Sequence, residues 1–150
     1  MQDEYCTKPS QFPYSITLKN GVPYIDELRT EQQFCFQHKV SLEIPPFVML
    51  LMLEVLCCRH VDPTRKQAAL DDLQMLVHID QIHQTLKDIH WEILGICQQI
   101  GGTLPAALFS YQQSLREFPK HGMQPATIYR IQDPVSYTHL RAHETSLHLV

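Results

Sequence analysis

Two cysteine–histidine pairs in the sequence have the spacing of metal ligands. Cys35 and His38 lie three positions apart, and Cys57 and His60 repeat that spacing further along the chain. A structural zinc site commonly joins two such pairs, since ligands two to four residues apart can reach one ion. Cys57, however, falls in an apolar run, where a free cysteine usually serves as a small buried hydrophobic residue. We prefer that interpretation, and we expect no metal and no other cofactor.

Two further histidines, His139 and His143, are spaced i, i+4, which on a helix would present two imidazoles to one zinc ion. No third ligand stands at a fixed spacing from them. Both belong to VSYTHLRAHETSLHLV, residues 135–150, which resembles a translated sequencing adaptor. We expect this stretch to be a non-native tail outside the fold, with the native chain ending near Pro134.

The motifs of common enzyme classes are missing around the potential nucleophiles. Ser110 and Ser114 have no nucleophile elbow, phosphate-binding glycine loop or His-Glu metal helix beside them. Asp71 and Asp72 are adjacent, so on a helix their side chains point about 100° apart and do not form a metal-binding pair. The sequence therefore indicates a chain without catalytic activity.

Composition and charge narrow the choice of partner. The chain has 150 residues, enough for one domain, with 12 Lys and Arg against 16 Asp and Glu. A net charge of −4 without a basic run argues against nucleic acid as a partner. The longest apolar run, residues 44–58, is too short to cross a bilayer and contains Glu54, so no membrane contact is expected.

Features of the termini and the cysteines bear on the cellular compartment. Residues 1–15 are polar, lack the basic start and apolar core of a secretory signal, and are expected to be a flexible lead-in. The five cysteines are odd in number and irregular in spacing, which suits reduced thiols. The sequence therefore indicates a cytoplasmic protein.

The segment 16–43 is expected to hold a β-hairpin and a short helix. In ITLKNGVPYI, residues 16–25, the Asn20-Gly21 dipeptide suits the type I′ turn of a hairpin between two short strands. Residues 26–42 fit an amphipathic helix. Its apolar face would carry Phe34, Phe36 and Val40.

The residues that follow predict a first helical hairpin. Pro46 can start a helix that runs to about His60 and, being apolar at nearly every position, is expected to be buried on most sides. Asp62 and Pro63 form a helix start, and the next helix would run to about His78. The short connection forces the two helices to lie antiparallel. The second helix has one apolar stripe, made of Ala69, Leu73, Leu76 and Val77.

A second hairpin is predicted after a polar link. Asp88 is the expected N-cap of a helix over 89–100, and Gly101-Gly102 would end it. Thr103 would cap the next helix, which Pro119 stops. The run ATIYRI, 126–131, can begin one more helix that covers the stack. The fold class is therefore all-α, with tandem antiparallel hairpins forming one helical domain over residues 44–134.

Gly95 lies inside a helix-forming run, where glycine is about 0.8–1 kcal/mol less favourable than alanine. A neighbouring helix that approaches too closely for a Cβ would explain it. Together with the surrounding residues, the pattern resembles the tetratricopeptide repeat, a helical hairpin of about 34 residues, although Gln98 stands where that repeat prefers an aromatic residue. The matching positions are Trp91, Leu94, Gly95, Ala107, Tyr111, Ser114 and Pro119. The first hairpin is a degenerate version of the same unit.

The resemblance implies a function in binding rather than catalysis. In tetratricopeptide arrays the first helices of successive repeats line a concave groove for a peptide or a partner helix. In this register Glu92, Ile96 and Gln99 would face that groove. The expected role is therefore a non-catalytic helical-repeat module that binds a protein or peptide, or supports an upstream domain of the same chain.

A wider resemblance offers an alternative. The stretches YIDELRTEQ, IPPFVMLLMLEVLCCRHVD, ALDDLQMLVHID and WEILGICQQIGGTLPAALFSYQQSL are similar, in this order, to the C-terminal helical tails of invertebrate proteins of the male-abnormal (Mab) type, cyclic GMP-AMP synthase-like nucleotidyltransferase family. This resemblance implies a C-terminal fragment without the catalytic core, because the paired acidic ligands and Gly-Ser loop of active members have no counterpart here. The partner would then be the upstream domain.

Overall fold

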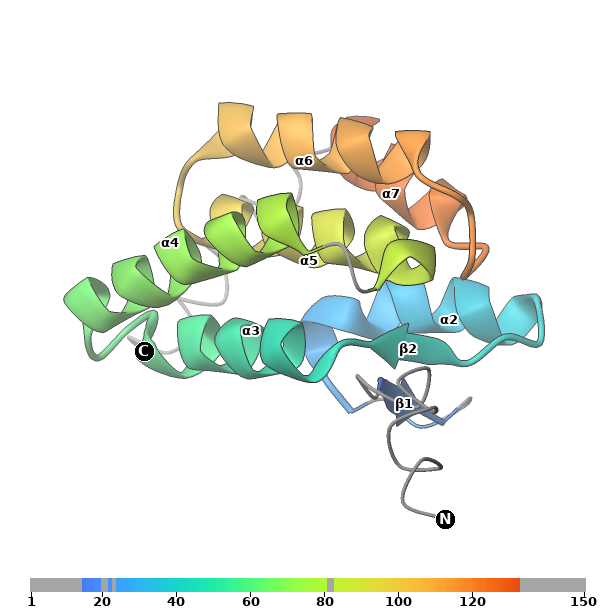
Figure 1. Ribbon diagram of the computed structural model, residues 1–150, viewed down its shortest axis with the longest axis horizontal. Helices are drawn as coiled ribbons and strands as arrows, with labels where there is room; N and C mark the ends of the chain where they lie inside the picture. The colour runs from blue at the N-terminus through green and yellow to red at the C-terminus, as the bar shows by residue number, and fades with distance from the viewer. Residues whose placement is uncertain (1–14, 20–21, 23, 81–82, 133–150) are drawn as a thin grey trace, which may run out of the picture.

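The computed structural model describes residues 15–19, 22, 24–80 and 83–132 (Figure 1). Most of the expected lead-in, His139, His143 and the adaptor-like stretch lie outside them. The elements, in chain order, are β1 (Ile16–Leu18), the 3-10 helix η2 (Asp26–Leu28), α2 (Arg29–Gln37), β2 (Leu42–Ile44), α3 (Pro46–Cys58), α4 (Pro63–Ile79), the 3-10 helix η3 (Gln84–Leu86), α5 (Lys87–Ile100), α6 (Leu104–Arg116) and α7 (Gln124–Gln132). The predicted fold class, helical with a small antiparallel sheet near the N-terminus, is confirmed.

The small sheet is built from a different second strand than the sequence suggested. β1 pairs antiparallel with β2, so that Ile16 lies opposite Ile44 and Leu18 opposite Leu42. The run after Asn20-Gly21, which we expected to be the second strand, forms none in its described residues. Burial explains the choice: Leu42 and Ile44 are completely buried, whereas Val22 is 45% exposed. Pairing with β2 therefore brings apolar side chains to the core.

The first predicted hairpin is α3 and α4, which Figure 1 shows joined by a short turn at the left of the view. The Asp62 side chain accepts a hydrogen bond from the Arg65 backbone N–H at 3.0 Å, which confirms the expected N-cap. Of the predicted stripe on α4, Ala69, Leu73 and Val77 are buried. Leu76 is half-buried against the same core.

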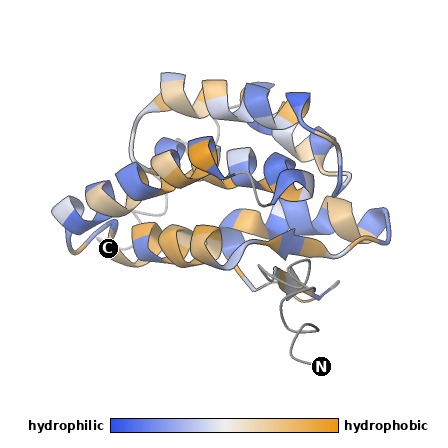
Figure 2. Ribbon diagram, viewed as in Figure 1, coloured by the Kyte–Doolittle hydropathy of each residue, from blue (hydrophilic) through white to orange (hydrophobic). Residues whose placement is uncertain are grey.

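The outer side of α3 departs from the prediction. The expected burial on most sides is wrong, because α3 packs against α4, α5 and the core on one side only. Every exposed position of α3 carries an apolar residue, and in Figure 2 most of the helix is drawn in the hydrophobic colour. We call this set the α3 stripe; it consists of Phe47, Leu50, Leu53 and Cys57.

The second hairpin, α5 and α6, has α5 at its centre. All residues of α5 from Asp88 to Ile100 are buried, and Figure 1 shows the helix between α6 above and α3 below. The expected N-cap at Asp88 is wrong, since Asp88 lies inside the first turn of α5. Thr103 is the N-cap residue of α6, as expected, but its hydroxyl donates to the Gln98 carbonyl at 2.9 Å and makes no capping hydrogen bond.

Gly95 is explained by a close contact within this hairpin. A Cβ built on Gly95 would lie 2.5 Å from Cε1 of Tyr111 in α6. The Tyr111 ring is completely buried, and its hydroxyl donates to Gln99 Oε1 at 2.6 Å. The space beside Gly95 is thus filled by an aromatic ring that is fixed at its far end. Ala107, the other small residue of the repeat pattern, is also completely buried.

The additional helix that the sequence suggested after Pro119 is α7. It packs against α6 and against α2, so the last helix of the chain contacts one of the first. In Figure 1 it lies beside α6, at the same end of the molecule as α2. The N- and C-terminal parts of the fold therefore close on each other around α5.

Gly95→Ala tests the contact with Tyr111. We expect a loss of about 1–3 kcal/mol in unfolding free energy by urea titration, since the clash outweighs the gain in helix propensity. In a Tyr111→Ala background the same substitution should cost little or be favourable, because the clashing ring is gone. An equal cost in both backgrounds would exclude the ring as the reason for the glycine.

Candidate functional site

The residues of the repeat pattern form packing contacts rather than a binding surface. Leu94, Tyr111 and Ser114 are buried, and the Ser114 hydroxyl donates to the backbone carbonyl of Asp88 at 2.8 Å. Trp91 is buried to 9% exposure and makes edge contacts with His78 and Phe109. Pro119 lies in an exposed position beyond the end of α6.

The three residues expected to line a concave groove do not form an open surface. Glu92 and Ile96 are completely buried, and Gln99 is 7% exposed. Glu92 accepts a hydrogen bond from Thr127 of α7 at 3.0 Å, and Gln99 is bound to Tyr111 of α6. The expectation was wrong because α6 and α7 fold over this side of α5. A binding surface has to be sought elsewhere.

The two cysteine–histidine pairs of the sequence are not brought together. Cys35 is buried, whereas His38 is exposed and binds the Phe34 carbonyl at 2.8 Å through Nδ1. Cys57, expected to be a buried hydrophobic residue, is exposed, and Cys58 takes the buried position. Within the described part of the chain, a group of ligands with metal-site geometry occurs elsewhere, at the end of α4 and the start of α5.

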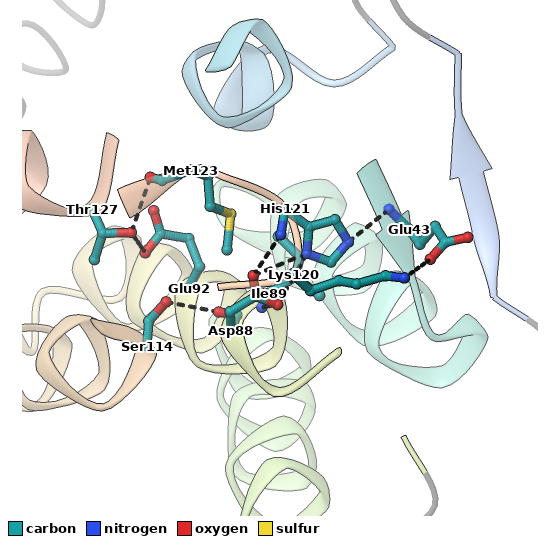
Figure 3. Close-up of polar contacts among 9 residues, drawn as sticks. All are labelled: Glu43, Asp88, Ile89, Glu92, Ser114, Lys120, His121, Met123 and Thr127. Atoms are coloured by element: carbon teal, nitrogen blue, oxygen red, sulfur yellow. Dashed lines mark hydrogen bonds and ion pairs between the residues drawn. The ribbon is translucent and has the colours of Figure 1, made fainter. Parts of the chain in front are cut away.

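A buried histidine–aspartate pair joins α5 to the loop before α7 (Figure 3). His121 Nδ1 lies 3.0 Å from both carboxylate oxygens of Asp88, and the His121 backbone N–H donates to the same carboxylate at 3.2 Å. On the other side of the ring, the Glu43 backbone N–H donates to Nε2 at 3.2 Å. Nε2 therefore acts as the acceptor, and Nδ1 carries the proton toward Asp88.

This pair resembles part of a catalytic triad but cannot work as one. A general base needs a free imidazole nitrogen near the nucleophile. Both nitrogens of His121 are occupied, its side chain is completely buried, and Ser114 binds the backbone of Asp88 rather than the imidazole. The arrangement fixes the loop against α5 and β2.

A second buried polar cluster connects α2, α5 and α7. Arg130 of α7 binds Glu31 of α2 through two hydrogen bonds, from Nε to Oε2 at 2.5 Å and from Nη2 to Oε1 at 2.9 Å. Its Nη2 also donates to the Glu27 carbonyl at 2.8 Å. Glu92 of α5 adds a second carboxyl group, whose Oε2 lies 3.8 Å from Arg130 Nε. One guanidinium thus faces two buried carboxyl groups.

The pKa values of the two carboxyl groups, Glu31 and Glu92, are shifted in opposite directions. Burial alone would raise the pKa of Glu31, but the charge and hydrogen bonds of Arg130 outweigh it and hold that pKa below its ordinary value. Burial and the adjacent Glu31 charge raise the pKa of Glu92 well above its ordinary value. The raised pKa favours the protonated form of Glu92, whose Oε1 accepts a hydrogen bond from Thr127. With Glu92 protonated, the Arg130 charge is balanced by Glu31 alone.

Two of the buried cysteines, Cys35 and Cys97, do not offer a nucleophile. Burial raises the pKa of the Cys35 thiol to about 12 and raises that of Cys97 as well. A thiol must lose its proton to attack a substrate or bind a metal. Neither of these two residues is therefore suited to that chemistry at neutral pH.

None of the helices in the described ranges combines the length and the apolar character that a membrane crossing requires. Comparison with protein-family models, with curated proteins and with solved structures finds no match for this chain. The geometry of the chain itself is therefore the source of any inference about its function.

Two isosteric substitutions test the charge states of the Arg130 cluster. Glu31→Gln removes the carboxylate that pairs with buried Arg130 and should cost about 3–5 kcal/mol of unfolding free energy at pH 7. Glu92→Gln should leave stability unchanged or raise it, since an amide replaces the carboxyl group whose pKa is raised by burial and by Glu31. Chemical denaturation of both variants measures the difference. Equal losses would contradict the assignment of the proton to Glu92.

The lowered pKa of Glu31 predicts an acid dependence of stability. A carboxylate whose pKa is depressed on folding contributes stability above its ordinary pKa of 4.5, and that contribution is lost as pH falls through the native value. The stability difference between wild type and Glu31→Gln should therefore be largest at neutral pH and shrink below about pH 4.5. Denaturation of both proteins across this range would show it; a difference independent of pH would contradict the depressed pKa.

Proposed function

We propose that this chain is a non-catalytic helical module that binds another protein surface through the α3 stripe. The observation that carries the proposal is the composition of the outer side of α3. Phe47 is 69% exposed and Leu50 58% exposed, with Leu53 and Cys57 on the same side. A surface helix normally places charged and polar residues there. A contiguous apolar patch on a folded domain marks an interaction site.

The surroundings of the stripe favour a protein partner. Glu54 and Arg65 form an ion pair with Oε1 to Nε at 2.8 Å beside it, which gives the patch a polar edge. An apolar centre with a polar rim is the usual anatomy of a protein interface. α3 contains neither lysine nor arginine, the residues that bind anionic membranes, and the net charge of −4 opposes binding to nucleic acid.

The buried polar clusters support the non-catalytic part of the proposal. His121 and Glu31 have their polar groups engaged inside the fold, and Glu92 is completely buried, with Oε1 accepting from Thr127. The described cysteines are free thiols, two of them adjacent at the end of α3, which favours a reducing compartment and hence a cytoplasmic location. The tetratricopeptide resemblance remains a proposal about the hairpin α5–α6. The proposed binding surface, however, is α3 and not a concave groove.

The resemblance to the Mab-type, nucleotidyltransferase-like tails suggests the alternative occupant. In that case an upstream domain of the same polypeptide would cover the α3 stripe. Both readings place a protein surface on α3, and they differ in whether the contact lies within one chain or between two.

A photoreactive amino acid at Leu50 tests the proposal in a cell extract, with the same group at the exposed Gln74 of α4 as control. We expect a defined cross-link from Leu50 and none from Gln74. Untagged wild type should compete with the cross-link, whereas Phe47→Glu with Leu50→Glu should compete at least about 30-fold less well, as for the loss of about 2 kcal/mol at an interface centre.

The matched charge control for this competitor is Gln74→Glu with Gln112→Glu, which adds the same charge at exposed positions away from α3. It should compete like wild type. A cross-link that appears equally from Leu50 and Gln74, or one that the double glutamate variant still suppresses, would reject the α3 stripe as the binding surface. In the natural full-length protein, a cross-link within one chain would identify the upstream domain as the occupant.

A further inference from the structure

Three potential metal ligands converge where α4 ends and α5 begins. Asp80 follows the last residue of α4, His83 precedes η3, and His90 lies in the first turns of α5. Their ligand atoms all lie within 4.8 Å of one another. Asp80 Oδ2 is 2.8 Å from His83 Nδ1 and 3.5 Å from His90 Nε2.

Several polar atoms of this group lack ordinary hydrogen-bond partners within the described residues. Both ring nitrogens of His90 and Nε2 of His83 are buried without a hydrogen bond. The His90 side chain is completely buried, and the Asp80 carboxylate, 3.5 Å from Nε2, lies beyond normal hydrogen-bond length. Buried polar atoms are nearly always satisfied, because an unsatisfied one costs free energy. A metal ion that accepts the lone pair of one His90 nitrogen would remove part of this cost, while the other ring nitrogen keeps its N–H.

We propose that Asp80, His83 and His90 form a binding site for a divalent transition-metal ion, with Zn²⁺ as the favoured occupant. Two imidazole nitrogens and one carboxylate oxygen suit zinc, whereas magnesium and calcium prefer oxygen ligands throughout. Tetrahedral zinc with bonds of about 2.0–2.1 Å places its ligand atoms about 3.3 Å apart. The two separations from Asp80 lie on either side of this value, so small side-chain adjustments would seat the ion.

Part of this group of side chains reaches the surface. The His83 side chain is 13% exposed and that of Asp80 is 7% exposed, so this edge of the group reaches the surface. Three protein ligands would leave the fourth position to water or to a group from a partner. Burial lowers the pKa of His90 to about 4, so the imidazole is neutral at pH 7, as a metal ligand must be.

Lys87 is the charged group that opposes the ion. Its ammonium donates to the backbone carbonyl of Asp80 and lies close enough to lower the pKa of His90. A positive charge at this distance must weaken the binding of a cation. Removing the Lys87 charge should therefore raise the affinity for the metal ion. A group of polar side chains with a purely structural role would show no such effect.

The test is titration of the chelator-treated full chain with Zn²⁺ by calorimetry and with Co²⁺ by visible absorption. We expect one ion per chain, a higher melting temperature with zinc, and the visible bands of four-coordinate cobalt with nitrogen and oxygen ligands. Asp80→Asn and His83→Ala should weaken binding by more than the roughly 10–100-fold typical of an outer-shell partner. Lys87→Gln should tighten it. Circular dichroism in chelator shows whether each variant is folded.

Two controls address the other histidines. His60→Ala removes the exposed histidine of the Cys57 pair, and the triple variant His139→Ala, His143→Ala and His148→Ala removes those near the C-terminal end. Both should bind zinc like wild type. Loss of binding in either control, sulfur-to-metal charge-transfer bands with cobalt, or no binding by the folded wild type at micromolar zinc would each overturn the site. None of these results depends on the α3 stripe.

Discussion

The fold depends on one constraint, the complete burial of a central helix that is not apolar. α5 carries Asp88, His90, Glu92, Gln98 and Gln99 among its buried residues. Each of these side chains must find a polar partner, because an unsatisfied polar group in the core is strongly unfavourable. Four of them reach a different neighbour each: the loop before α7, α7 itself, Ser110 and Tyr111 of α6. The polar side chains of α5 thus orient the elements that surround it.

The sequence predicted the helical hairpins well because their signals are local. Asp62-Pro63 identifies a helix start through the hydrogen bond it makes three residues later, and Gly101-Gly102 marks the end of α5 because Gly102 takes a positive φ of 86°. The sheet was predicted less well. Asn20-Gly21 is a sound local turn signal, but the choice of partner strand depends on which residues reach the core. Leu42 and Ile44 bury their side chains completely, whereas Val22 and Tyr24, which follow Asn20-Gly21, stay largely exposed.

The buried clusters could not be predicted from the sequence, because the periodicity of a helix does not distinguish a buried charged residue from an exposed one. Glu31 is a polar residue in a weakly amphipathic helix, and Arg130 lies 99 positions away. α2 ends at Gln37, so Val40 of the expected face lies outside it. Phe34 is half-buried and Phe36 exposed, and Glu31, Gln32 and Cys35 are buried instead. Glu92 was assigned to an open groove for the same reason. Only the position of α7 shows that its carboxyl group is covered.

Two features are not explained by the requirements of folding. The outward positions of α3 contribute nothing to the core, so polar residues there would fold as well and would reduce the tendency to aggregate. Likewise, the core would accommodate an apolar residue in place of His90 without leaving two ring nitrogens unsatisfied. Asp88, Gln98 and Gln99 of the same helix each have a hydrogen-bond partner, so this chain can satisfy buried polar side chains of α5. Function is therefore best sought at two places: the α3 stripe, where apolar side chains are exposed, and the junction of α4 and α5, where buried ring nitrogens lack hydrogen bonds.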